Sequence, residues 1–168
     1  VIAAAGWEWD RHVDELGRTI GDEALEPTRI YTRMLLDLIR SDGINVHALS
    51  HVTGGGLAAN LARVLPTGAL ATVDRATWTP PPVFSLVQEL GSVPQPDLER
   101  TLNMGVGFVV VLPAEQADAA VTRSQGLGVP AWVVGEVMGD DRETSEDIVR
   151  GAKGVDGGAV RVSGTYRG

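Results

Sequence analysis

Apolar residues recur at helical spacing between residues 28 and 40, with Pro27 just before this stretch and Gly43 just after it. This spacing predicts a helix over residues 28–40. Residues 44–52 alternate between apolar and polar and predict a strand that ends at a run of glycines. A second helical pattern follows and stops at Pro66; its apolar positions are Leu57, Leu61, Val64 and Leu65. We therefore expect the order helix, strand, glycine turn, helix.

The second half of the chain adds further elements. Apolar runs predict strands over residues 69–73, 105–112, 131–138 and 159–162, and helical spacing or composition predicts helices over residues 82–90, 97–102 and 113–124. Residues 105–112 are apolar at both alternating positions, which is typical of a strand buried on both faces in the middle of a sheet. The strand over 131–138 should be covered on at least one side.

The two ends of the chain differ from its middle. Residues 1–6 are apolar and helix-like, and we interpret residues 1–13 as the end of a truncated helix. Residues 139–168 are polar and rich in glycine, so we expect a partly mobile tail, with mobility around residues 140–157. The acidic residues of this tail lack the ordered spacing of a calcium loop and suit a solvated segment better than a metal site.

Composition narrows the class of protein. A chain of 168 residues with 43% hydrophobic content can form one domain with its own core, so we expect a single domain. The net charge of −8 argues against binding to nucleic acid or to an anionic membrane. The absence of cysteine excludes disulfides, zinc–thiolate sites and thiol nucleophiles, and it fits a cytoplasmic protein. No apolar run approaches the length of a membrane span.

The most distinctive stretch is His51-Val52-Thr53-Gly54-Gly55-Gly56, between the predicted strand and helix. Three glycines at such a junction indicate a sharp bend or the close approach of another group. A phosphate suits this position because a helix N-terminus favours an anion. The alternative is a tight turn that serves helix–strand packing. Thr53 can donate its hydroxyl to a ligand or can cap the helix.

Several motifs, in order along the chain, resemble one enzyme family. They are Leu16-Gly17-Arg18-Thr19-Ile20-Gly21 with Leu25-Glu26-Pro27-Thr28-Arg29-Ile30-Tyr31, the stretch His51–Gly56, the following Asn60 and Arg63-Val64-Leu65-Pro66, Val73-Asp74 with Trp78 and Pro82-Val83-Phe84, Asn103-Met104-Gly105-Val106-Gly107, and Trp132 with Gly135 and Val137. Together, over residues 14–138, they resemble the C-terminal domain of phosphoribosylformylglycinamidine cyclo-ligase, or aminoimidazole ribonucleotide (AIR) synthetase. Leu102 departs from the family's usual phenylalanine.

This resemblance implies a fold and an activity. The implied fold is α+β, a mixed β-sheet flanked by helices. The implied reaction is the ATP-dependent closure of formylglycinamidine ribonucleotide to aminoimidazole ribonucleotide, with ATP and Mg²⁺ bound mainly by an N-terminal domain that is absent from this chain. The resemblance also implies a homodimer that pairs each such domain with its own N-terminal ATP-binding domain. We expect the 168 residues alone to be inactive.

The resemblance and the residue chemistry together nominate site residues. We assign catalytic roles to His51, whose imidazole can exchange protons near neutral pH, and to Asn103. The residues expected to bind substrate or phosphate are Thr28, Arg29, Thr53, Gly54, Gly55, Gly56, Asn60, Arg63 and Gly105. We assign no metal site.

Each nomination has a structural alternative. Thr28 can cap the predicted helix, and Arg29, at an unfavourable helix start for a cation, can pair with Glu26 or Asp22. Asn103 can be a turn residue in a left-handed conformation. For the whole chain, the alternatives are a related superfamily member with selenophosphate or thiamine-monophosphate chemistry, or a stand-alone module that binds a phosphate or ribonucleotide.

Overall fold

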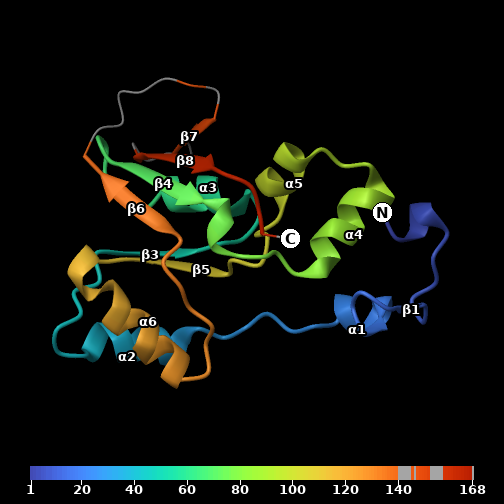
Figure 1. Cartoon of the computed structure of the whole chain (residues 1–168), viewed down its shortest axis with the longest axis horizontal. Helices are drawn as coiled ribbons and strands as arrows, with labels where there is room; N and C mark the ends of the chain where they lie inside the picture. The colour runs from blue at the N-terminus through green and yellow to red at the C-terminus, as the bar shows by residue number, and fades with distance from the viewer. Residues whose placement is uncertain (140–144, 146, 152–156, 168) are drawn as a thin grey trace.

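The computed structural model describes residues 1–139, 145, 147–151 and 157–167, which fold into helices and three small sheets (Figure 1). The helices are α1 (Ile20–Ala24), α2 (Thr32–Arg40), α3 (Gly56–Ala62), α4 (Pro82–Gly91), α5 (Gln95–Thr101) and α6 (Ala117–Gly126), with 3-10 turns at Ala3–Ala5, Arg75–Thr77 and Ala114–Gln116. Within the described residues, no helix is both long enough and apolar enough to cross a membrane.

A four-stranded mixed sheet forms one layer. Its order is β6 (Gly135–Met138), β4 (Leu70–Asp74), β8 (Ala159–Ser163) and β7 (Ile148–Arg150). Strands β4 and β8 are parallel, whereas β6 and β7 pair antiparallel with their neighbours. Helix α3 packs on this sheet around Val160, whose side chain is fully buried. The expected α+β fold with a mixed sheet is confirmed.

A two-stranded ribbon separates this sheet from α2 and α6, which lie on the opposite side of the ribbon in Figure 1. It consists of β3 (Ala48–His51) and β5 (Phe108–Val111), paired antiparallel. Val109 contacts the core around α3, while Val110 contacts the core of α2 and α6. Burial of β5 on both faces is therefore confirmed. Its expected position in the middle of a sheet is wrong, because β3 is its only partner among the described strands.

Other expectations about the strands need correction. All four residues of β6 are exposed, although we expected cover on at least one side. The reason is its position: β6 is an edge strand that pairs only with β4 in the described sheet. Strand β7 has no counterpart among the sequence predictions. The expected mobility around residues 140–157 concerns mainly positions outside the described residues.

The N-terminal third also differs from expectation. Residues 1–13 contain a single 3-10 turn, which ends where Gly6 takes a left-handed conformation (φ 69°), and the two-residue strand β1 (His12–Val13) instead of an α-helix. Strand β1 pairs with β2 (Arg18–Thr19), and Thr19 caps α1 through a capping box with Asp22. Helix α2 begins only at Thr32, so the first residues of the predicted helix over 28–40 lie outside it.

Candidate functional site

Two loops meet at one end of the β3–β5 ribbon. The glycine loop, Thr53–Gly56, follows β3, and the asparagine loop, Asn103–Gly107, precedes β5. Because the strands are antiparallel, the end of β3 and the start of β5 coincide, with His51 opposite Phe108. The Val52 amide donates a hydrogen bond to the Gly107 carbonyl at 3.0 Å and ties the loops together. The structure thus unites two predicted site segments that lie about fifty residues apart in sequence.

The side chain of His51 is exposed and lies in a small aromatic cluster beside these loops. Its ring stacks on Phe108, with centroids 5.7 Å apart and planes 18° apart, and Tyr31 approaches edge-on at 6.4 Å. A Cβ at Gly107 would lie 2.0 Å from the Tyr31 hydroxyl oxygen, so Gly107 makes room for that ring. Our site prediction missed Tyr31; the signal available was its place at the end of the motif that starts at Leu25.

The three consecutive glycines differ in what the fold requires of them. At Gly56 (φ 71°) a Cβ would lie 1.7 Å from the backbone carbonyl oxygen of Glu99, so this glycine lets α3 and α5 touch through their backbones. Gly55 has φ 102° and ordinary surroundings, so its conformation alone favours glycine. Gly54 has neither a positive φ nor any atom within 4 Å of an added Cβ. Gly54 is therefore the glycine that the fold does not require.

Asn60 shapes the glycine loop from within. Its side chain is 3% exposed, and its amide nitrogen donates to the carbonyls of Thr53 at 3.2 Å and Gly56 at 2.7 Å. Its amide oxygen accepts a hydrogen bond from Arg63, which also donates to the Ala59 carbonyl. Both side chains thus bind the protein's own atoms, and their predicted contacts with substrate stay predictions.

Thr53 does not cap α3. The N-cap position is Gly55, which has no side-chain cap bond, so the capping interpretation of Thr53 is wrong and its exposed side chain points to solvent-accessible space at the loop. In the asparagine loop, the Asn103 side-chain oxygen accepts a hydrogen bond from the Gly105 amide at 3.0 Å. The left-handed residue there is Met104 (φ 51°), not Asn103, and it is followed by Gly105 (φ 91°). Asn103 therefore stabilises a tight turn.

Thr28 and Arg29 lie in the extended, exposed segment before α2. Because α2 starts at Thr32 with Tyr31 at its N-cap, Thr28 is not a helix cap and Arg29 is not at a helix start. Among the described residues, no ion pair joins Arg29 to Glu26 or Asp22, and both carboxylates have other partners. Glu26 accepts a hydrogen bond from Arg18 at 2.6 Å, and Asp22 accepts one from Thr19 at 2.7 Å. Binding of substrate or phosphate by Thr28 or Arg29 stays a prediction.

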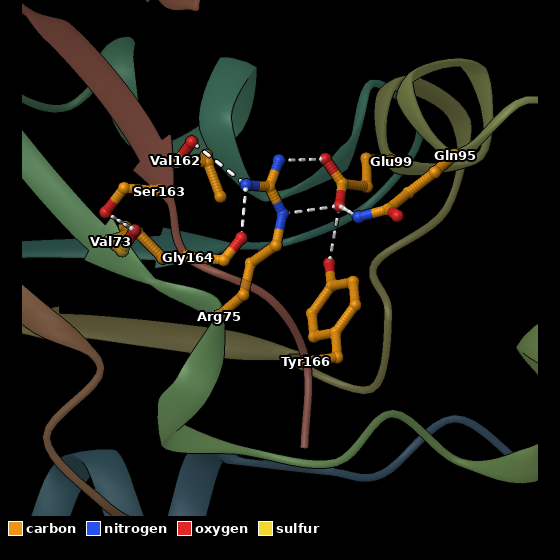
Figure 2. A network of polar contacts seen from close by, with 8 residues as sticks. All are labelled: Val73, Arg75, Gln95, Glu99, Val162, Ser163, Gly164 and Tyr166. Carbon is orange, nitrogen blue, oxygen red and sulfur yellow. Dashed lines mark hydrogen bonds and ion pairs between the residues drawn. The ribbon is translucent and has the colours of Figure 1, made fainter. Parts of the chain in front are cut away.

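A polar network centred on Glu99 and Arg75 was missed by sequence reasoning (Figure 2). The Glu99 carboxylate on α5 accepts two hydrogen bonds from Arg75, at 2.7 and 2.8 Å, and one each from Tyr166 and Gln95 at 2.9 Å. Arg75 also donates to the carbonyls of Val162 at 3.0 Å and Gly164 at 3.3 Å. The network thereby joins the 3-10 turn that contains Arg75, helix α5, strand β8 and the residues that follow β8. Because these segments are far apart in sequence, no local sequence pattern predicts the network.

Ionisation in this network follows from burial and charge. Burial raises the pKa of the Glu99 carboxyl, but hydrogen bonds from Arg75, Gln95 and Tyr166 outweigh it and hold the pKa below its ordinary value. Burial, followed by the hydrogen bond to the Glu99 carboxylate, raises the pKa of the Tyr166 phenol. The hydrogen bond to Glu99 raises the pKa of Arg75. At neutral pH the network therefore holds a bidentate ion pair and a neutral phenol.

Comparison with known proteins points to one family. A family model described as AIR synthase related protein, C-terminal domain, matches residues 2–148. A putative phosphoribosylformylglycinamidine cyclo-ligase of Streptomyces fradiae is 52% identical over 162 residues, 96% of this chain and 82% of that protein. Phosphoribosylformylglycinamidine cyclo-ligases of Symbiobacterium thermophilum and Pseudothermotoga lettingae are 43% and 38% identical over 84% and 87% of this chain. The chain spans only 39% of the length of each of these two.

Proposed function

Because this chain belongs to the family of AIR synthase related proteins, of which it forms the C-terminal domain, we propose that it is the substrate-binding part of a cyclo-ligase. The proposed reaction converts formylglycinamidine ribonucleotide and ATP to aminoimidazole ribonucleotide, ADP and phosphate. The names of the relatives favour this reaction over selenophosphate or thiamine-monophosphate chemistry and over a stand-alone binding module.

The chemistry of ring closure explains which residue types the site needs. An amide oxygen is a poor leaving group, so transfer of the terminal phosphoryl group of ATP to that oxygen makes it a good one. The amidine nitrogen of the substrate then attacks the activated carbon and loses a proton, and phosphate departs with the oxygen. Such a reaction needs positioning and charge stabilisation more than a protein nucleophile.

The observation that carries the proposal is the open backbone at Gly54. Gly55 and Gly56 are explained by conformation and packing, whereas Gly54 leaves space beside an exposed loop at the N-terminal end of α3. A substrate phosphate can approach the backbone there without meeting a side chain. His51, exposed at the same end of the ribbon, is the proposed proton acceptor, and Asn103, with its neighbour Gly105, lines the other loop.

We assign ATP and Mg²⁺ to a part of the enzyme outside this chain. Among the described residues, no three carboxylate or imidazole side chains come together in a way that could hold a metal ion. The same proposal includes pairing with an N-terminal ATP-binding domain, a homodimeric enzyme and a cytoplasmic location. It also includes inactivity of the 168 residues alone.

Substrate binding and turnover test this function. In the full-length protein, Gly54→Ala should lower kcat/KM for formylglycinamidine ribonucleotide by about tenfold or more, because the methyl group displaces the phosphate. The matched control is Gly126→Ala, since Gly126 at the end of α6 also has free space and no positive φ but lies in a different layer. Unchanged kcat/KM in Gly54→Ala would contradict the proposed binding of a substrate phosphate at the Gly54 backbone.

Calorimetry tests whether ATP binds to this chain or to another part of the enzyme. Titrating the 168-residue chain with ATP should give no tight binding, and titrating it with formylglycinamidine ribonucleotide should give at most weak binding. Tight binding of ATP to this chain would overturn the assignment of nucleotide binding to the rest of the enzyme.

A further inference from the structure

Besides the direct hydrogen bond between Val52 and Gly107, the glycine loop and the asparagine loop share a support that lies outside the site. Glu99 and Trp78 each contact one loop, and Tyr166 contacts both Glu99 and Trp78. We propose that Tyr166 is a positioning residue that holds the two substrate loops in register with each other. This inference rests on the proposed function for its meaning in catalysis, but the contacts that carry it are independent of the substrate.

Two series of contacts, which we call arms, lead from Tyr166 to the loops. The first arm runs through Glu99 to the glycine loop. The Tyr166 hydroxyl donates to the Glu99 carboxylate at 2.9 Å, and the Glu99 backbone carbonyl faces Gly56 so closely that a Cβ there would lie 1.7 Å away. A shift of α5 at Glu99 therefore moves the start of α3, since their backbones are in direct contact. Arg75 completes the arm by binding the same carboxylate with two hydrogen bonds.

The second arm runs through Trp78 to the asparagine loop. The Trp78 side chain is 8% exposed, and its ring nitrogen donates to the Met104 carbonyl at 3.0 Å. The Tyr166 ring meets the Trp78 ring edge to face, with centroids 5.1 Å apart and planes at 74°. Because Met104 holds a left-handed conformation in the middle of the loop, the position of its carbonyl sets the turn between Asn103 and Gly105.

The segment that carries Tyr166 is itself firmly placed. It follows β8, which pairs in parallel with β4 from Ala159 to Ser163, and Arg75 binds the carbonyls of Val162 and Gly164. The family model matches residues 2–148, so β8 and Tyr166 lie outside that match. A segment beyond the matched region thus supplies a side chain that touches both arms.

Two substitutions separate the arms. Tyr166→Phe keeps the ring on Trp78 and removes the hydrogen bond to Glu99, whereas Tyr166→Leu removes both contacts. The matched control is Ser163→Ala, which deletes a hydroxyl on the same segment that donates a long hydrogen bond, 3.4 Å, to the Val73 carbonyl. Each variant is made in the full-length protein, and amide hydrogen exchange is followed residue by residue.

The expected exchange pattern is specific. Tyr166→Phe should speed exchange in the glycine loop by about tenfold, the effect of losing one hydrogen bond to a charged group, and leave the asparagine loop unchanged. Tyr166→Leu should speed exchange in both loops, and Ser163→Ala in neither. Amides of β4 should keep their protection in all three variants, which excludes general destabilisation as the cause.

Turnover completes the test. In an active enzyme, kcat of Tyr166→Leu should fall by about a hundredfold, as expected for misplacement near 1 Å, measured where the variant is fully folded. Unchanged exchange in both loops overturns the positioning role whatever the activity, and so does unchanged kcat in an active enzyme. If the wild-type protein shows no cyclo-ligase turnover, the proposed function fails, and the exchange pattern alone then decides whether Tyr166 positions the loops.

Discussion

Replacing Gly56 by alanine is the sharpest test of how the glycine loop is built. The new methyl carbon would lie 1.7 Å from the Glu99 carbonyl oxygen and 3.3 Å from the Leu102 carbonyl oxygen. Real Cβ atoms essentially never come closer than 3.0 Å to such an atom, so α3 and α5 would have to separate by about 1 Å or more. Alanine would also have to hold φ 71°, in the left-handed region.

The magnitude follows from these two penalties. Forced separation of packed elements costs about 1–3 kcal/mol, and a left-handed alanine costs about 1–2 kcal/mol. Gly56→Ala should therefore lower the free energy of unfolding by about 2–5 kcal/mol, measured as a shift of the urea midpoint at constant slope. For a chain of this size the same loss lowers Tm by about 4–20 °C.

The neighbouring glycines are the controls. Gly55→Ala meets no close atom but must hold φ 102°, so it should cost about 1–2 kcal/mol. Gly54→Ala meets neither obstacle and should be neutral or stabilise the chain by up to about 1 kcal/mol, since alanine restricts the unfolded chain. The expected order of destabilisation is Gly56, then Gly55, then Gly54. A Gly56→Ala variant as stable as the wild type would refute the backbone contact between α3 and α5.

Three further outcomes follow from the same geometry. The pKa of the Glu99 carboxyl is lowered on folding, so the ionised carboxylate stabilises the fold above its unfolded pKa, and this stabilisation is lost as the pH falls through the folded pKa. Acid unfolding should therefore depend less steeply on pH in Glu99→Gln than in the wild type. Equal steepness would contradict this role of Glu99. Asn60→Ala should cost about 1–3 kcal/mol in a thermal melt, because loop carbonyls lose their donor, and a neutral result would mean that the loop keeps its shape without Asn60. His51→Gln should lower kcat of the full-length protein by about a hundredfold or more while its Tm stays within about 2 °C, since this side chain is exposed; retained kcat would remove His51 from proton transfer.

Local patterns were enough to predict most elements and to nominate the segments of the proposed site. The helical spacing of apolar residues over 28–40 identified α2, and apolar residues at both alternating positions over 105–112 identified β5 as buried on both faces. Both patterns work because the periodicity of apolar residues reflects which face meets a core. Glycine runs identified both loops, since few other residues adopt such backbone conformations. His51, Thr53–Gly56, Asn103 and Gly105 were nominated from sequence as site residues, and their meeting at one end of the ribbon is what the structure adds.

Contacts between distant residues were decided only by the tertiary structure. The structure, and not the sequence pattern, gave the start of α2 at Thr32 rather than residue 28, the exposure of the edge strand β6 and the absence of a capping role for Thr53. The same holds for Gly56, whose need for glycine comes from Glu99, and for Tyr166.

Sequence by itself determined the periodicities, the turns and the resemblance to a cyclo-ligase domain, because these depend on residues close together along the chain. Only the folded chain determined which glycine packs closely, which has a positive φ and which has open space beside it. It also determined that a tyrosine near the C-terminus supports both loops. The physical reason is that packing and hydrogen bonding act between atoms close in space, and local sequence pattern does not specify which distant residue arrives there.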